Sequence, residues 1–119
     1  MTEILKKLVI IPTYNEKENI QKLAEMILAL DYDFNVCVVD DNSPDGTAQI
    51  VESLQQTHSK GKNIYLLKRP GKLGLGTAYK AGIKYGLANG FDIVFTMDAD
   101  FSHHPKYLPD FLRKLNDCD

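Results

Sequence analysis

Residues 93–100 read Ile-Val-Phe-Thr-Met-Asp-Ala-Asp, an apolar run that ends in two carboxylates one residue apart. The run has the length and composition of a buried β-strand, so Asp98 and Asp100 are expected where that strand ends. Parallel α/β sheets bind their ligands at the carboxyl ends of the strands. Two carboxylates there can hold a hard divalent cation together with the phosphates of a substrate. The stretch therefore predicts a parallel sheet with a metal-assisted site for a phosphorylated ligand.

Three more apolar runs precede this one, and a helical pattern follows each of the four. Strands are predicted at Leu8–Ile11, Val36–Val39, Ile64–Leu67 and Ile93–Met97. Apolar residues at helical spacing run from Ile20 to Leu28, from Thr47 to Leu54, from Ala78 to Tyr85 and from Leu108 to Leu115. Right-handed crossovers place such helices on both faces of a sheet. The order predicts an α/β fold with a doubly wound, mostly parallel sheet and the strand order 3-2-1-4.

Local signals mark the ends of several elements. Pro12 is expected to end the first strand, and Asn15 is expected to cap the helix that follows. Pro105 suits the first position of the last helix. Ala81 and Gly82 are small residues in the third helical pattern, which indicates that this helix packs closely on the sheet.

The composition is that of one globular domain. The 119 residues are 44% hydrophobic and 25% charged, with a formal net charge of −2, which argues against a general nucleic-acid binder. No apolar run approaches the roughly 20 residues that cross a bilayer, and Met1 to Lys7 lacks the apolar stretch of a secretion signal. We expect a cytoplasmic protein, or one on the cytosolic face of a membrane.

Basic residues are concentrated in one segment. Ser53 to Phe91 contains no Asp or Glu but holds seven of the 14 Lys and Arg residues. Two interpretations are open. The segment is a solvated face, or Lys68, Arg69 and Lys72 face phosphates or an anionic membrane.

Polar clusters directly follow three of the predicted strands. They are Tyr14-Asn15-Glu16, Asp40-Asp41-Asn42 and Asp98-Ala99-Asp100. Any single cluster could be only a helix cap or a turn, and that is the better explanation for Asn42 or Asp45 alone. Because the carboxyl ends of parallel strands lie at one edge of the sheet, the three clusters together predict one crevice.

A glycine-rich segment, Gly71 to Gly76, follows the third predicted strand. It is not a Walker A loop, because Thr77 stands where a Lys would follow the last glycine, and the dinucleotide fingerprint would follow the first strand. Its expected role is to let the backbone approach a ribose or phosphate at a helix N-terminus. His103 and His104 follow the acidic pair, and a metal-binding role for either one is an open alternative to a simple lead into the next helix.

Four ordered motifs carry a resemblance to a known family. They are Ile11-Pro12-Thr13-Tyr14-Asn15-Glu16, Val39-Asp40-Asp41-Asn42-Ser43-Pro44-Asp45-Gly46-Thr47, Gly74-Leu75-Gly76-Thr77-Ala78 and Met97-Asp98-Ala99-Asp100-Phe101-Ser102-His103-His104-Pro105. Together they resemble the family 2 glycosyltransferases of GT-A fold. Within that family the sequence is most similar to the polyprenol-phosphate (dolichol-phosphate) mannose synthases.

The resemblance implies transfer of a hexose, typically mannose from GDP-mannose, to a polyprenol phosphate with inversion at the anomeric carbon. It implies nucleotide-sugar contacts from Pro12, Tyr14, Glu16, Val38, Asp40, Asp41, Lys72, Gly74, Asp98, Ala99 and Asp100. It also implies that Asp98 and Asp100 are the catalytic pair and hold Mg²⁺ or Mn²⁺, with Asp100 as the first candidate ligand. Ser102 is the third candidate metal residue, in a slot where some relatives carry a better ligand.

Members of this family continue beyond the acidic motif, so residues 1–119 are expected to form a single nucleotide-sugar-binding domain, the N-terminal part of a longer catalytic domain. The fourth strand would then be an unprotected edge, which favours self-association. Contact with a membrane surface is a further expectation.

Three alternatives remain from the residues. A phosphatase with an Asp-x-Asp nucleophile would carry that motif after its first strand, whereas Asp98 follows the fourth. A phosphorelay receiver domain would also want an acidic pair after the first strand, where this chain has Thr13-Tyr14-Asn15. The third alternative is a fragment that binds a sugar nucleotide without turning it over.

Overall fold

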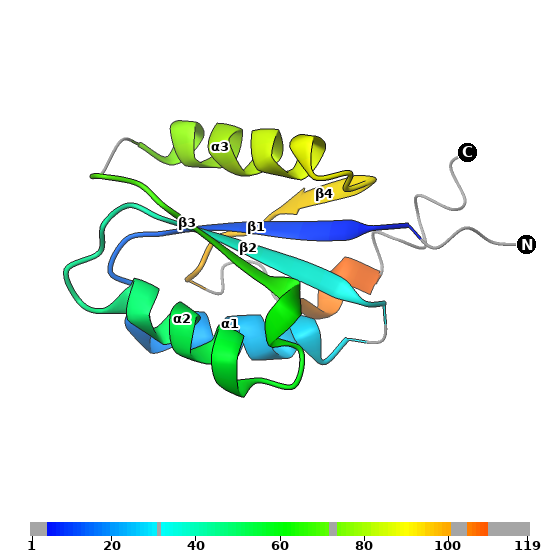
Figure 1. Cartoon of the computed structure of the whole chain (residues 1–119), viewed down its shortest axis with the longest axis horizontal. Helices are drawn as coiled ribbons and strands as arrows, with labels where there is room; N and C mark the ends of the chain where they lie inside the picture. Colours follow the sequence, from blue (N-terminus) through cyan, green and yellow to red (C-terminus); the bar gives the residue numbers. More distant parts are fainter. Residues whose placement is uncertain (1–4, 31, 72–73, 101–104, 110–119) are drawn as a thin grey trace, which may run out of the picture.

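The computed structural model describes residues 5–30, 32–71, 74–100 and 105–109. Strands and helices alternate along these residues (Figure 1). The elements are β1 (Lys7–Thr13), α1 (Lys17–Leu28), β2 (Phe34–Asp40), α2 (Thr47–Thr57), the 3₁₀ helix η1 (Gly61–Asn63), β3 (Ile64–Lys68), α3 (Leu75–Ala88), β4 (Ile93–Thr96) and the 3₁₀ helix η2 (Pro105–Tyr107). Each predicted strand is present, and three of the predicted helices lie between them.

The four strands form one parallel sheet in the order β3-β2-β1-β4, which confirms the predicted topology. Val9 of β1 pairs with Val36 of β2 on one side and with Phe95 of β4 on the other. Helix α3 covers one face, and α1 and α2 cover the opposite face (Figure 1). The sheet is therefore doubly wound, and both of its faces are covered.

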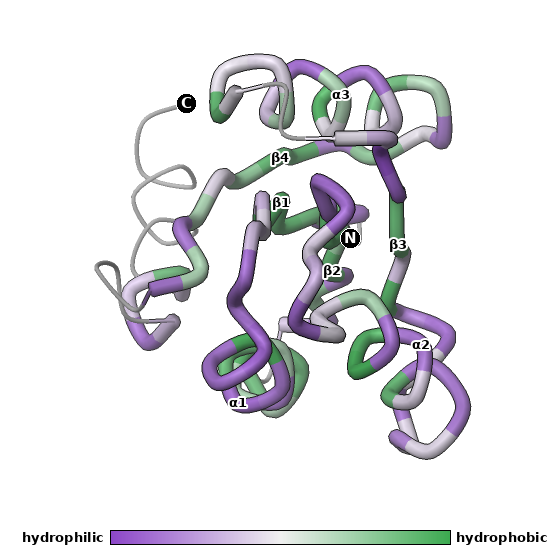
Figure 2. Tube along the Cα trace, turned by 90° about the vertical axis from the view of Figure 1, so that its left-hand side faces the viewer, coloured by the Kyte–Doolittle hydropathy of each residue, from purple (hydrophilic) through white to green (hydrophobic). Residues whose placement is uncertain are grey.

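Burial on both faces explains why the strands are continuous apolar runs. Alternate residues of β1 and β2 belong to opposite halves of the core. Val9, Ile11, Val36 and Val38 face α1 and α2, whereas Leu8, Ile10, Cys37 and Val39 face α3. Figure 2 shows the hydrophobic colour on the strands and the hydrophilic colour on outer turns of α1. All seven residues of β1 are buried, so this central strand lies in the middle of the core.

Strand β1 continues through Pro12 to Thr13, so the prediction that Pro12 ends it was wrong. The amide of Met97 donates to the Ile10 carbonyl at 3.0 Å, and the amide of Asp41 donates to the Thr13 carbonyl at 3.1 Å. Even-numbered residues of β1 thus bond towards β4, and odd-numbered residues towards β2. The Pro12 nitrogen faces the β4 side beyond the last residue of β4, so its missing N–H removes no bond of the ladder.

The last predicted helix can be followed only at its start. Pro105 to Tyr107 form η2, and Leu108 is buried in the half of the core that contains α1. The predicted positions Phe111, Leu112 and Leu115 lie outside the described residues. No helix in the described part of the chain is long and apolar enough to cross a bilayer.

Helix α3 packs closely on the sheet, as its small residues predicted. A Cβ atom at Gly82 would lie 2.4 Å from the Ile10 Cγ2 atom, and one at Gly86 would lie 3.2 Å from the Leu8 Cδ2 atom. Helix α3 therefore approaches β1 at Gly82 more closely than a Cβ atom permits, and the contact at Gly86 would be tight.

Gly82→Ala is expected to lower the free energy of unfolding by about 1–3 kcal/mol, because the added methyl group overlaps Ile10 in a packed core. Gly76→Ala is the matched control on the same helix, since a Cβ atom there meets nothing within 4 Å. That control should be neutral or stabilising by up to about 1 kcal/mol. Urea unfolding measures both, and equal stabilities of the two variants would contradict the close packing.

Candidate functional site

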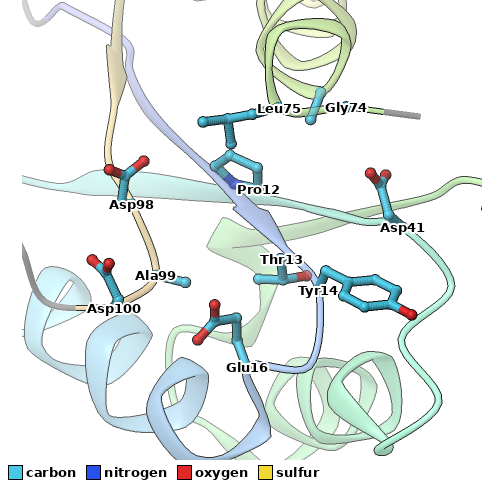
Figure 3. Close-up of a pocket in the computed structure, with 11 residues that line it drawn as sticks. Pro12, Thr13, Tyr14, Glu16, Asp41, Gly74, Leu75, Asp98, Ala99 and Asp100 are labelled. Atoms are coloured by element: carbon cyan, nitrogen blue, oxygen red, sulfur yellow. The ribbon is translucent and has the colours of Figure 1, made fainter. Parts of the chain in front are cut away.

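A pocket of about 350 Å³ opens at the carboxyl edge of the sheet (Figure 3). Its lining comes from the segments after β1, β2 and β4 and from the start of α3. The lining residues are Pro12, Thr13, Tyr14, Glu16, Asp41, Gly74, Leu75, Ala78, Asp98, Ala99 and Asp100. The structure therefore brings together the three polar clusters and the glycine-rich segment that the sequence predicted to converge.

One wall of the pocket is acidic. Met97 and Ala99 are 4% and 3% exposed and anchor the segment after β4 in the core, while Asp98 and Asp100 line the pocket. The Glu16 side chain approaches the same wall from the loop before α1 (Figure 3).

The pKa of Glu16 lies above its usual value. Burial is the main cause, and the negative charges of Asp100 and Asp45 add to it, whereas a hydrogen bond with Asn19 opposes it. The acidic wall thus already carries charge repulsion before any anionic ligand arrives.

Tyr79 of α3 belongs to the site, although the sequence analysis did not select it. Its hydroxyl donates a hydrogen bond of 2.5 Å to Asp98 Oδ1. Burial, this bond and the charges of Asp98 and Asp100 raise the pKa of Tyr79 to about 12. A signal was available in the sequence, because Tyr79 follows the sheet-facing Ala78 and a half-buried tyrosine hydroxyl needs a partner.

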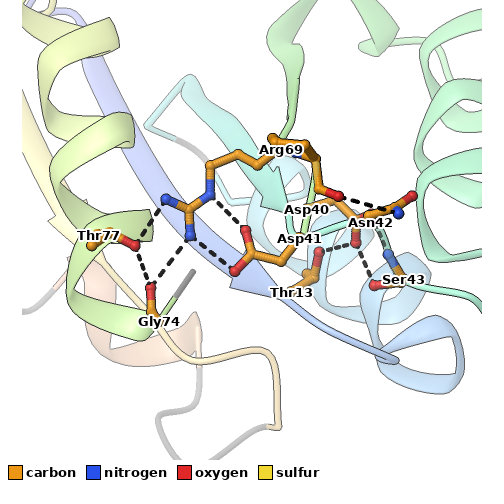
Figure 4. Close-up of polar contacts among 9 residues, drawn as sticks. Thr13, Asp40, Asp41, Asn42, Ser43, Arg69, Gly74 and Thr77 are labelled. Carbon is orange, nitrogen blue, oxygen red and sulfur yellow. Dashed lines mark hydrogen bonds and ion pairs between the residues drawn. The ribbon is translucent and has the colours of Figure 1, made fainter. Parts of the chain in front are cut away.

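The opposite wall is electrically compensated. Arg69 Nε and Nη2 donate to the two carboxylate oxygens of Asp41 at 2.6 and 2.9 Å (Figure 4). The same guanidinium reaches the Thr77 hydroxyl and the Gly74 carbonyl at 2.9 and 3.3 Å. With side chains only 12% and 8% exposed, Arg69 and Asp41 form a bidentate pair that ties β3 and the loop after β2 to the start of α3.

These contacts show where two of the three basic residues that were proposed to face phosphates lie. Arg69 is engaged by Asp41, and Lys68 lies 3.2 Å from Glu52 in an exposed ion pair. Lys72, the third residue proposed to face phosphates, lies outside the described residues, as do Ser102, His103 and His104.

Two predicted contact residues do not line the pocket. Val38 is fully buried in the sheet, in the half of the core that faces α1 and α2. Asp40 is 1% exposed, and its carboxylate accepts hydrogen bonds from the Thr13 hydroxyl and from the amide and hydroxyl of Ser43 at 2.7, 3.0 and 2.6 Å. Of the two adjacent aspartates, Asp41 therefore faces the ligand space, and Asp40 joins two loops.

Asn15 does not cap α1, contrary to the expectation. It adopts a left-handed conformation with φ of 58°, and its own amide donates to the Ser43 hydroxyl at 2.9 Å. The next two amides, of Glu16 and Lys17, donate to the side chains of Thr47 and Asp45. The loop after β2 thus supplies the caps that the first helix lacks locally. As predicted, the role of Asp45 is structural, since it also accepts bonds from the amide and hydroxyl of Thr47.

The donor set suits a hard divalent cation. Asp98 and Asp100 offer carboxylate oxygens, which Mg²⁺ and Mn²⁺ prefer. Among the described residues no cluster of three His, Cys, Asp or Glu side chains could hold a metal ion. A cation bound by the two aspartates would need further ligands from a bound diphosphate or from water, which is the usual arrangement for Mg²⁺ at phosphate sites.

The fold and the pocket agree with the outcome of a family comparison, in which the model for glycosyl transferase family 2 matches residues 8–119. The chain belongs to this family. Apart from Lys7, the match covers all residues of the described strands and helices, including the segments that form the pocket.

Among curated relatives, the family 2 chain is 40% identical over 103 residues to a polyprenol monophosphomannose synthase of Mycolicibacterium smegmatis, covering 87% of this chain and 38% of the relative. It is 38% identical over 115 residues to an undecaprenyl-phosphate mannosyltransferase of Micrococcus luteus, covering 97% of this chain and 46% of the relative. The chain thus spans less than half the length of these two relatives.

Solved structures share the fold. A mannosyltransferase from Pyrobaculum calidifontis, solved in complex with GDP-Man and Mn²⁺, superposes with a TM-score of 0.73 at 30% identity, covering 83% of this chain and 28% of that one. S. aureus TarS (residues 1–349), in complex with UDP-GlcNAc, superposes with a TM-score of 0.76 at 27% identity, covering 95% of this chain and 32% of that one. Both neighbours bind nucleotide sugars on a related α/β framework.

Asp45→Ala is expected to lower the free energy of unfolding by about 1–2 kcal/mol, because it removes the caps of two helices. Burial alone would raise the pKa of Asp45, but hydrogen bonds from Thr47 and Lys17 outweigh it and hold the pKa below the usual 3.8. Its contribution to stability is therefore present above pH 3.8 and lost as the pH falls through the lower pKa of the folded state.

Urea unfolding of the wild type and Asp45→Ala at several pH values tests this. The difference between the two proteins should narrow below pH 3.8. Glu18→Ala, which removes an exposed carboxylate from the first turn of α1, should cost less than about 1 kcal/mol. A loss at Glu18 as large as the loss at Asp45 would show that general charge, and not capping, is responsible.

Proposed function

We propose that this chain is the donor-binding part of a metal-dependent, inverting hexosyltransferase. Its donor is GDP-mannose, and its acceptor is a polyprenol phosphate. The family supports a glycosyltransferase, and the names of two relatives support the mannosyl group and the lipid phosphate. The neighbour that was solved with GDP-Man and Mn²⁺ supports the donor and the cation.

The distribution of charge in the pocket carries this proposal. Asp98, Asp100 and Glu16 share one wall, whereas Asp41 on the other wall is neutralised by Arg69. A diphosphate facing the acidic wall would be repelled unless a cation lay between them. The same cation, when bound, stabilises the negative charge that develops on the leaving nucleoside diphosphate.

The remaining residues of the pocket would position the nucleoside. Gly74, at the N-terminus of α3, has a φ of 103° and offers backbone without a side chain. Pro12, Tyr14 and Asp41 line the part of the pocket next to it, and Ala99 lies between the two aspartates. An acceptor phosphate is already anionic, so transfer to it needs little base catalysis. A polyprenol acceptor also brings the protein to a membrane surface.

Asp100→Asn should weaken Mn²⁺-dependent binding of GDP at least tenfold, or about 1.4 kcal/mol, because it removes one of two carboxylates facing the diphosphate. Titration calorimetry with GDP measures this in the presence of Mn²⁺ and after chelation. Chelation should weaken binding to the wild type as well.

Asp33→Asn is the matched control for this experiment. Asp33 is exposed in the loop before β2, at the opposite end of the sheet, and its φ of 53° suits Asn as well as Asp. Its affinity for GDP with Mn²⁺ should equal that of the wild type. Equal affinities for Asp100→Asn and the wild type, or no effect of the chelator, would refute the metal-binding role of Asp100.

The alternative of binding without turnover has a direct test. Because the curated relatives are more than twice as long, residues 1–119 are expected to bind GDP-mannose but to transfer little mannose to polyprenol phosphate. A radiolabelled transfer assay compares this chain with one extended past Asp119. Full turnover by residues 1–119 would refute the proposal that they form only the donor-binding part.

The same comparison tests self-association. Within the described residues β4 pairs only with β1, so its other edge is open to another strand. Sedimentation should show dimers or larger species for residues 1–119, and a monomer at high concentration would contradict this.

A further inference from the structure

Tyr79 connects two parts of the molecule that meet at the acidic wall. It lies in the second turn of α3, and its hydroxyl donates to Asp98 Oδ1, in the segment after β4. The two residues are 19 positions apart in the sequence. The bond therefore joins the helix on one face of the sheet to the end of an outer strand.

The position of the Tyr79 hydroxyl is fixed by packing. The ring is partly buried against the half of the core that contains Ile10, Val39 and Ala78. The close approach of Gly82 to Ile10 sets the height of α3 above the sheet. The location of the hydroxyl therefore follows from the packing of α3 on the sheet.

Asp98 is held from the opposite face by its neighbours in the sequence. The Met97 amide bonds to Ile10, and the side chains of Met97 and Ala99 are buried in the half of the core that faces α1. The backbone of Asp98 is thus anchored below the sheet, and its carboxylate is anchored above it by Tyr79. A carboxylate has about four acceptor sites, so accepting this bond leaves it able to bind a cation.

We propose that Tyr79 is a positioning residue that fixes the Asp98 carboxylate beside Asp100 for binding of a divalent cation and a diphosphate. This inference rests on the proposed function of the site. The bond lowers the number of conformations open to the Asp98 side chain, and so lowers the conformational entropy that is lost on binding.

Tyr79→Phe removes the hydroxyl and keeps the ring. We expect it to weaken Mn²⁺-dependent GDP binding about five- to tenfold, which corresponds to about 1–1.4 kcal/mol. Tyr85→Phe is the matched control, because Tyr85 lies on the same helix and its ring packs on Tyr65 at 5.7 Å, away from the pocket. That variant should bind as the wild type does.

Calorimetry with GDP and Mn²⁺ is carried out well below the unfolding midpoint of each variant, and the midpoints are measured separately. The wild type, Tyr79→Phe, Asp98→Asn and the double variant form a cycle. If Tyr79 acts through Asp98, its substitution should cost less than about twofold once Asp98 is already replaced. A purely structural role would not produce this dependence on Asp98.

Each outcome is decisive. A lowered midpoint with unchanged affinity for Tyr79→Phe overturns the positioning role and leaves the proposed function intact. Equal losses from Tyr79→Phe with and without Asp98 also overturn it. A wild-type chain that binds no GDP with Mn²⁺ refutes the proposed function, and the role of Tyr79 with it.

Discussion

The hydrogen bonds accepted by the buried carboxylate of Asp40 hold together the loops that form the pocket. The carboxylate accepts three hydrogen bonds, from Thr13 at the end of β1 and from Ser43 in the loop after β2. The Ser43 hydroxyl in turn accepts the Asn15 amide, so the loops after two adjacent strands are joined. These donors offset the cost of burying a carboxylate, and the same loops then cap α1 and carry Tyr14 and Asp41 to the pocket.

Patterns within single elements were sufficient to predict the fold. Strands buried on both faces are largely apolar, and the runs Leu8–Ile11 in β1 and Val36–Val39 in β2 meet that condition, so they could be recognised without knowledge of their partners. Their alternation with helices then restricts the topology, because crossovers between parallel strands are right-handed. These two constraints leave few arrangements, and the observed order β3-β2-β1-β4 is the predicted one.

Contacts between distant segments could not be predicted in the same way. Asn15 resembles a cap, yet the α1 amides bond to side chains that come 28 and 31 residues later. Asp40 and Asp41 are adjacent and chemically identical. Alternation along the strand implies that they face opposite sides, but only the packed helices decide that Asp41 meets Arg69 on the α3 side. The sequence could signal that the Tyr79 hydroxyl needs a partner, but not that this partner is Asp98, which lies after another element.

The pocket combines a frame held by hydrogen bonds with a wall that is rich in carboxylates. Asp41 is neutralised by Arg69, whereas Asp98, Asp100 and Glu16 share a wall. Burial, together with the charges of Asp100 and Asp45, raises the pKa of Glu16. In a phosphatase or a receiver domain the acidic pair would follow β1, but here β1 ends at Thr13 and is followed by Tyr14 and Asn15. Acidic residues at an outer strand, facing a glycine at a helix N-terminus, match a ligand whose phosphates reach the protein through a cation and whose nucleoside lies against the backbone. The negative charge of this wall is therefore the feature that the proposed cation-dependent reaction requires.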